Sequence, residues 1–160
     1  MAIGGALGAI LAYPIVRYVL FPVGRQTVSG AAEPIDALGS DELVAGGKPV
    51  KVELVGEGVR NGWGVSDRVP LGSAYVRKDD KGEISALSSV CPHLGCAIAY
   101  DGGEDEYKCP CHRSAFGLDG EKKSGPAKRG LDPLPVEVKD GRVHLTFVRY
   151  RQDVPDREPV

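Results

Sequence analysis

The fold of this 160-residue chain is decided by Cys91-Pro92-His93-Leu94-Gly95-Cys96, here box 1, and by Cys109-Pro110-Cys111-His112-Arg113-Ser114, here box 2. All four cysteines of the chain lie in these two boxes. Cysteines so close in sequence indicate one local site rather than a disulfide framework spread over the fold.

The two boxes contain a ligand set for a metal centre. With Cys96 and Cys111 left aside, they read Cys-x-His, fifteen residues, then Cys-x-x-His. Two thiolates and two imidazoles suit one tetrahedral zinc, and they also suit a two-iron cluster in which two Cys bind one iron and two His the other. A disulfide between the remaining cysteines would clamp both boxes, which a zinc site does not need, and a reducing cytosol would not preserve it.

The sequence around the boxes predicts a mainly β domain. Glycine (22) and proline (12) outnumber the ten aromatic residues, which favours turns and short strands over long helices. Residues 50–54 alternate as in a half-buried strand, and 73–77 with 82–87 read as a hairpin. A second hairpin is predicted around Asp140-Gly141, between alternating runs on either side. The formal net charge of -2 gives no support to nucleic-acid binding.

The N-terminal segment predicts a membrane anchor. Ala2 to Val16 carry no charge, and the apolar run through Phe21 is about 20 residues, the length that crosses a bilayer as a helix. Pro14 is tolerated in such a helix, and Arg17 near its end can reach the interface. A cleaved signal peptide is the alternative, but no basic region precedes the run. No twin-arginine pair is present, so either an export signal lies upstream of this start, which we expect, or no such signal is used.

These patterns divide the chain into four parts. Residues 1–23 are expected to form the transmembrane helix, and 24–47, rich in Gly, Ala, Ser and acidic residues, a flexible hinge. Residues 48–150 form the expected metal-binding domain, followed by a C-terminal tail at 151–160. Trp63 and Tyr107 are expected to be core aromatic residues.

The boxes closely resemble those of Rieske [2Fe–2S] proteins from the quinol–cytochrome c (cytochrome bc-type) oxidoreductases. The likeness covers the spacing, the doubled Cys-Pro, the extra cysteine pair and Gly125-Pro126, where this family has a proline loop. It implies an antiparallel β sandwich with a cluster-binding subdomain. It further implies that Cys91 and Cys109 bind one iron, that His93 and His112 bind the other, and that Cys96 and Cys111 form a disulfide.

The resemblance also implies roles around the cluster. His112 would hydrogen-bond the quinol with His93 exposed nearby, and Leu94 would shield the cluster and pack against cytochrome b. Ser114 would donate a hydrogen bond to a bridging sulfide. Phe116 stands where the family often has a Tyr that donates to a cysteine sulfur. Because one donor is missing, we predict a lower potential, which favours menaquinol as the electron donor.

Basic residues flank this site. Arg113 occupies a position that is commonly Gly in the family, and with four others it would give the cluster a basic rim: Lys122, Lys123, Lys128 and Arg129. Such a rim can steer a cytochrome partner, although a run of charges is more often only a solvated face.

The function implied is electron transfer within a complex. The subunit would accept an electron and a proton from quinol and pass the electron to a c-type cytochrome, with cytochrome b as its other partner. It would lie in the inner membrane with one span and its head on the periplasmic side, and it would not be catalytic alone. The alternatives are a Rieske subunit of another exported enzyme such as arsenite oxidase, a ring-hydroxylating dioxygenase component, and a zinc-stabilised binding module.

Overall fold

The computed structural model describes residues 2–21, 23, 33–60 and 63–160. The chain forms two compact units. The first comprises Met1–Gly30 and Glu57–Val69, and the second, here the head, comprises Ala31–Gly56 and Pro70–Val160. Both boxes belong to the head.

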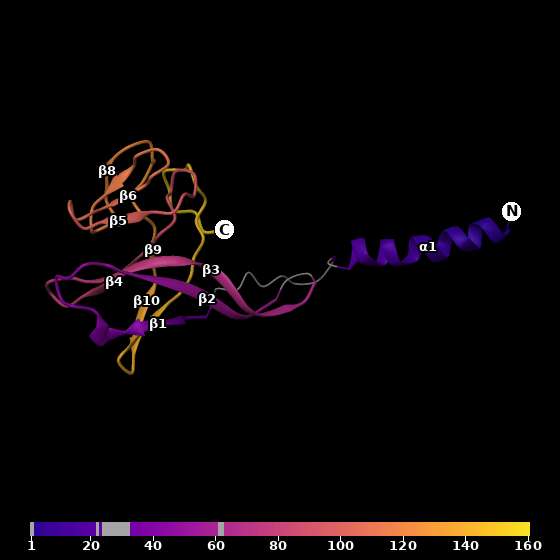
Figure 1. The fold of residues 1–160 in the computed structure, drawn as a ribbon, viewed down its shortest axis with the longest axis horizontal. Helices are drawn as coiled ribbons and strands as arrows, with labels where there is room; N and C mark the ends of the chain where they lie inside the picture. Colours follow the sequence, from indigo (N-terminus) through magenta and orange to yellow (C-terminus); the bar gives the residue numbers. More distant parts are fainter. Residues whose placement is uncertain (1, 22, 24–32, 61–62) are drawn as a thin grey trace. The chain divides into compact units, whose positions relative to one another are not determined.

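The first unit contains one helix, α1 (Ala2–Leu20), which includes Pro14 (Figure 1). Large apolar side chains from Ile10 to Leu20 are exposed along it. Within the described residues, no helix combines the length and the apolar character that a membrane span requires. The helix predicted for this segment is therefore present.

Trp63 is not a core residue. Half of its surface is exposed, and its ring lies 4.5 Å from that of Tyr18 and 5.6 Å from that of Phe21, centroid to centroid. The expectation for Trp63 is wrong because its ring packs on aromatic side chains that follow or end α1 rather than on the β core. Tyr107 is fully buried, as predicted.

The strands form three sheets, and the second of these extends from the head into the first unit through residues 57–60 and 65–69 (Figure 1). The first sheet has the order β1-β11-β10, with β1 at Ile35–Gly39, β10 at Val136–Lys139 and β11 at Arg142–Leu145. The second has the order β2-β3-β4-β9, formed by Val50–Arg60, Val65–Lys78, Ile84–Ser88 and Pro133–Leu134. The third has the order β5-β6-β7-β8, formed by Ala99–Asp101, Glu106–Lys108, Ala115–Phe116 and Lys122–Ser124.

Both predicted hairpins are present. β3 pairs with β4, from Ala74 opposite Ser88 to Lys78 opposite Ile84. β10 pairs with β11 around Asp140 and Gly141, whose φ angles are 50° and 75°. A tight two-residue turn of this kind needs positive φ at both central positions, which Asp and Gly tolerate.

Two hydrophobic cores lie in the head. The first is shared by the first two sheets and includes Leu54, Val76 and Val143. The second lies beside the boxes and includes Tyr107, Phe116, Leu131 and the two cysteines at positions 91 and 109. Figure 1 shows the β5–β8 sheet on the opposite side of β3 and β4 from β1 and β10. The cores thus separate a scaffold from a smaller, metal-binding part.

The predicted hinge at 24–47 requires a correction. β1 pairs with β11, with Ile35 opposite Leu145, and Leu38 and Leu43 are buried in the first core. The 3-10 turn at Ser40–Glu42 follows β1 directly. Residues 33–47 therefore belong to the head because their few apolar side chains complete its core. Residues 24–32 of the predicted hinge lie outside the described residues.

Candidate metal centre

Box 1 is a loop closed by its own backbone. The Cys91 amide donates to the Cys96 carbonyl at 2.8 Å, and the Gly95 amide donates to the Cys91 carbonyl at 2.9 Å. Gly95 has a φ of 78°, a conformation that glycine adopts without steric cost. A bridge between Val90 and Ala97 closes the base of the loop. Cys91 is thereby fixed inside the head.

Box 2 closes in the same way. The Cys109 amide donates to the Ser114 carbonyl at 2.8 Å, and the Arg113 amide donates to the Cys109 carbonyl at 3.1 Å. Arg113 has a φ of 58°, in the left-handed region that favours glycine. This conformation gives a physical reason why the position that Arg113 occupies is commonly Gly in the family it resembles.

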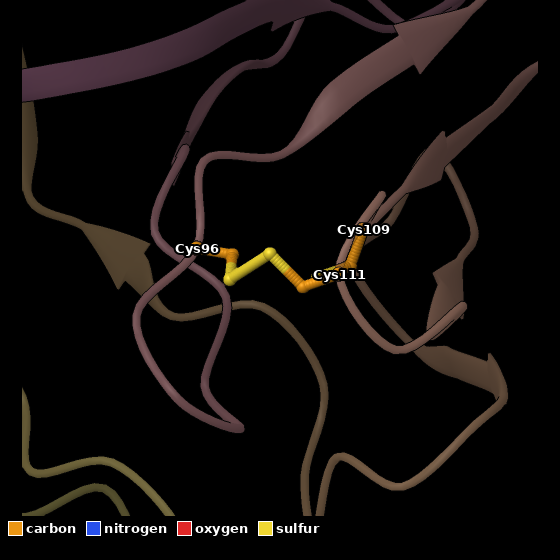
Figure 2. Close-up of side chains that lie close together, drawn as sticks. All are labelled: Cys96, Cys109 and Cys111. Carbon is orange, nitrogen blue, oxygen red and sulfur yellow. A yellow bond between two sulfur atoms is a disulfide. The ribbon is translucent and has the colours of Figure 1, made fainter.

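A disulfide joins the two boxes. Cys96 and Cys111, the pair that the resemblance implies, are bonded, with their Cα atoms 6.6 Å apart (Figure 2). The sulfur of Cys109 lies within 4.8 Å of both. Disulfide sulfurs carry no thiolate charge, so only the third member of this group, Cys109, remains a strong metal ligand.

Cys91 and Cys109 are both free and buried, and they lie in the same hydrophobic core. Burial, with a smaller contribution from the neighbouring Cys109 thiol, raises the pKa of the Cys91 thiol to about 11, although the backbone amides of His93 and Leu94 act in the opposite direction. Two adjacent thiols in an apolar core release their protons when a metal binds. The Cys91 and Cys109 thiols are therefore suited to bind a metal ion together.

His93 and His112 lie side by side. Their ring centroids are 4.8 Å apart and the ring planes are nearly perpendicular. The Nδ1 atom of His93 is buried, and within the described part of the chain it has no hydrogen-bond partner. A buried polar atom is almost always satisfied, so an uncompensated imidazole nitrogen two residues after the buried Cys91 fits a metal ligand. The residues present therefore fit a cluster bound by two Cys and two His.

The other predicted residues surround this group. Leu94 is 59% exposed, whereas Phe116 is fully buried in the same core as both free cysteines. Ser114 is buried, and its Oγ accepts a hydrogen bond from the Ala127 amide at 3.2 Å. Gly125, with a φ of 88°, packs so closely that a Cβ there would collide with Ser114.

Pro126, next to Gly125, is exposed. The segment 125–127, here the proline loop, thus lies against box 2. The disulfide and the Ser114–Ala127 hydrogen bond thus link box 1, box 2 and the proline loop, which contain the predicted site residues other than Phe116.

The predicted basic rim is mostly neutralised. Arg129 is buried and forms an ion pair with Asp132 at 2.8 Å. Lys128 pairs with Asp153 at 3.2 Å, and Lys123 pairs with Glu106 at 3.2 Å. The acidic partners of Lys123 and Lys128 are 17 and 25 residues away in sequence, so the local sequence does not predict these ion pairs. The Arg-x-x-Asp spacing at 129–132, in contrast, does indicate the pair between Arg129 and Asp132.

The fold and the site define a class of protein: a β scaffold whose smaller subdomain brings two buried thiols and two imidazoles together inside a disulfide-clamped pair of loops. The Rieske [2Fe–2S] domain family matches residues 34–137. The chain belongs to this family, and its cofactor is a [2Fe–2S] cluster.

Relatives place the chain within the bc-type branch of that family. It is 31% identical to the menaquinol:cytochrome c reductase iron–sulfur subunit of Geobacillus thermodenitrificans, over 93% of this chain and 86% of the relative. It is 33% identical to the cytochrome b6-f complex iron–sulfur subunit of Gloeobacter violaceus, over 88% of this chain and 75% of the relative.

The fold also resembles that of an oxygenase. A crystal structure of naphthalene 1,2-dioxygenase superposes with a TM-score of 0.55 and 20% identity, over 73% of this chain and 26% of the dioxygenase. At this identity the likeness concerns the fold alone.

Proposed function

We propose that this chain is the electron-transfer subunit of a quinol–cytochrome c reductase. It takes an electron and a proton from quinol and passes the electron to a c-type cytochrome. The names of the two relatives, both iron–sulfur subunits of cytochrome complexes, support this proposal. The observation that carries it is the pairing of two buried free thiols with two adjacent imidazoles, one of which has an unpartnered buried nitrogen.

In this proposal Cys91 and Cys109 bind the inner iron, and His93 and His112 bind the outer iron. Once bound by these residues, the cluster supplies one-electron transfer at a potential above that of all-cysteine clusters. Neutral imidazoles in place of two thiolates lower the negative charge around the centre, so an added electron is less disfavoured. Ser114 and the amides of His93 and Leu94 add hydrogen-bond donors that favour the reduced state further.

The exposed His112 gives the site its second task. Its ring nitrogen that is not used for metal binding accepts a hydrogen bond from the quinol hydroxyl and holds the proton that quinol releases. His93 stands beside it, and Leu94, more than half exposed, provides an apolar contact for cytochrome b. A hydrophobic tip of this kind suits a membrane quinol site better than the arsenite oxidase alternative.

We assign menaquinol as the donor. Phe116 provides no hydroxyl to the cysteine sulfurs in its core, which lowers the potential. The Geobacillus relative is named a menaquinol reductase subunit, which supports the same assignment.

The chain is proposed to be anchored in the inner membrane by α1, with the head on the periplasmic side. The exposed apolar side chains of α1 and the aromatic group Tyr18, Phe21 and Trp63 support this anchor. Aromatic side chains gather where a membrane meets water. Because Trp63 is the only tryptophan, its fluorescence reports on this place. In vesicles we expect quenching by brominated lipid, and quenching by aqueous acrylamide alone would contradict the anchor.

The cluster assignment is tested by anaerobic assembly of the full chain. We expect the visible and EPR spectra of a Rieske cluster, lost in His112→Ala and kept in His144→Ala. His144 is the third histidine and lies on β11, so it controls for loss of any imidazole. Colourless protein that contains zinc would establish the binding-module alternative instead.

A further inference from the structure

The C-terminal residues Arg149–Val160, here the strap, fold back on themselves. The Arg151 amide donates to the Glu158 carbonyl and the Val160 amide to the Arg149 carbonyl, both at 2.9 Å. Tyr150 forms a β-bridge with Pro159 between these bonds. The expected tail is therefore an ordered hairpin with a defined place on the head.

Arg129 holds the strap from inside the head. Its guanidinium, 5% exposed, forms two hydrogen bonds of 2.8 Å with the Asp132 carboxylate. It also donates to the Val154 carbonyl at 2.7 Å and to the Arg151 carbonyl at 2.9 Å. A buried charge is stable only when its donors are satisfied, so the strap completes the coordination of a cation that Asp132 alone leaves partly unmatched.

Lys128 holds the strap from the surface. Its Nζ donates to the Asp153 carbonyl at 2.8 Å and lies 3.2 Å from the Asp153 carboxylate. Asp153 has a φ of 58°, in the left-handed region. The two contacts hold the Asp153 carbonyl and carboxylate and so help to keep the residue in this unfavourable conformation.

That amide reaches box 1. The Asp153 amide donates to the Pro92 carbonyl at 2.9 Å, directly between Cys91 and His93. Among the described residues, this is the one backbone hydrogen bond that joins 92–95 to a segment outside box 1. The Pro92 carbonyl belongs to the peptide that leads into His93, so the strap restrains the backbone that carries the His93 ring.

These contacts close a ring around the centre. The disulfide joins box 1 to box 2, and Ser114 of box 2 accepts from Ala127 of the proline loop. Lys128 and Arg129 follow Ala127 directly and hold the strap, which returns to Pro92.

We propose that the strap positions the box 1 ligands, Cys91 and His93. Asp153 and Arg129 are positioning residues that set the orientation of the His93 ring. This proposal rests on the assignment of His93 as an iron ligand. Without the strap, the Pro92 carbonyl loses its hydrogen bond to Asp153, and we expect the ligand loop to sample more conformations.

The test compares the full chain with a chain that ends at Tyr150, both with the cluster assembled. We expect a Rieske signal from both, with broader EPR lines from the shorter chain because the geometry at His93 varies. We also expect the shorter chain to lose iron to a chelator about tenfold faster, the effect of one lost net hydrogen bond. No Rieske signal from the full chain would contradict the proposed function. Equal line shapes and equal loss rates would overturn the strap proposal alone.

If circular dichroism shows that the shorter chain does not fold, a point variant tests the strap proposal instead. Lys128→Met removes both Lys128 contacts from an exposed position, and Lys122→Met, on β8, is its matched control. We expect broader EPR lines and about threefold faster iron loss for Lys128→Met only, the effect of a surface pair. Identical behaviour of the two variants would overturn the proposal.

Discussion

At the residue scale, a substitution of Phe116 is expected to change the reduction potential of the cluster directly. Its ring is fully buried in the core that contains Cys91 and Cys109. In Phe116→Tyr the added hydroxyl would donate to a cysteine sulfur and stabilise the reduced state. One hydrogen bond of roughly 0.5–1.5 kcal/mol corresponds to a rise of about 20–60 mV for one electron. Protein-film voltammetry measures this midpoint.

The matched control for this prediction is Phe147→Tyr, in the other hydrophobic core. It adds the same hydroxyl to the head but not to the cysteines, and we expect its midpoint to equal that of the parent chain. A midpoint that does not move in Phe116→Tyr would show that the ring position cannot supply the donor.

The disulfide is the second prediction at this scale. It closes a loop with a sequence separation of 15 residues, and a cross-link of that span restricts the unfolded chain. In a double variant, Cys96→Ala with Cys111→Ala, we expect the free energy of unfolding to fall by about 3 kcal/mol. Urea unfolding of the full chain measures it. A loss equal to that of a surface double alanine substitution, Lys122→Ala with Lys139→Ala, would contradict the clamp.

Sequence reasoning at this scale identified the chemistry but not its supports. The two boxes were readable because Cys and His at fixed spacing have few other uses. The sequence does not predict the contacts of the buried Arg129 with the strap or the hydrogen bond from Asp153 to Pro92. Each of these joins segments that are distant in sequence and that only the fold brings together. For this reason the sequence predicts only a C-terminal tail at 151–160, where the structure has the ordered strap.

At the element scale, ion pairs link neighbouring parts of the third sheet. Lys108 lies 2.8 Å from Asp101, and Lys123 lies 3.2 Å from Glu106. The Lys108 ammonium holds the pKa of Asp101 below its usual value, and the Lys123 ammonium does the same for Glu106. A carboxyl with a depressed pKa stabilises the fold above its unfolded pKa and loses that contribution as pH falls through its folded pKa.

We therefore expect the melting temperature to fall as pH decreases from about 5 to about 3, and to fall less at high salt. Lys108→Met should reduce this dependence, whereas Lys139→Met, on β10, should keep it. Circular dichroism melting curves of the full chain at several pH values measure the effect. Parallel pH curves for all three proteins would contradict a role for these pairs.

Elements with strong local signals were predicted, and elements that depend on the rest of the head were not. Asp140-Gly141 marks its hairpin because both positions need positive φ. β1 has only five residues in a polar segment. It forms a strand because it pairs with β11 and because Leu38 is buried in the first core. Its apolar content is too small to give a period by itself.

At the scale of the whole molecule, the proposed function requires the head to reach two partners, a quinol site and a cytochrome. The correction at β1 shortens the segment available for such movement, because 33–47 are part of the head. What remains is the sequence between Gly24 and Glu33, which is rich in small and polar residues. We propose, from this composition alone, that the segment serves as the linker between anchor and head.

This leads to a prediction about turnover. A run of six prolines inserted after Gly30 extends the linker as a stiff segment, and we expect slower quinol-dependent reduction of the cytochrome in the assembled complex. The EPR spectrum of the cluster should not change, because the insertion lies outside the head. A Gly-Ser insertion of equal length is the control for added length. If both insertions give the parent rate, the head does not need a flexible linker, and the transfer of electrons must occur from one fixed position.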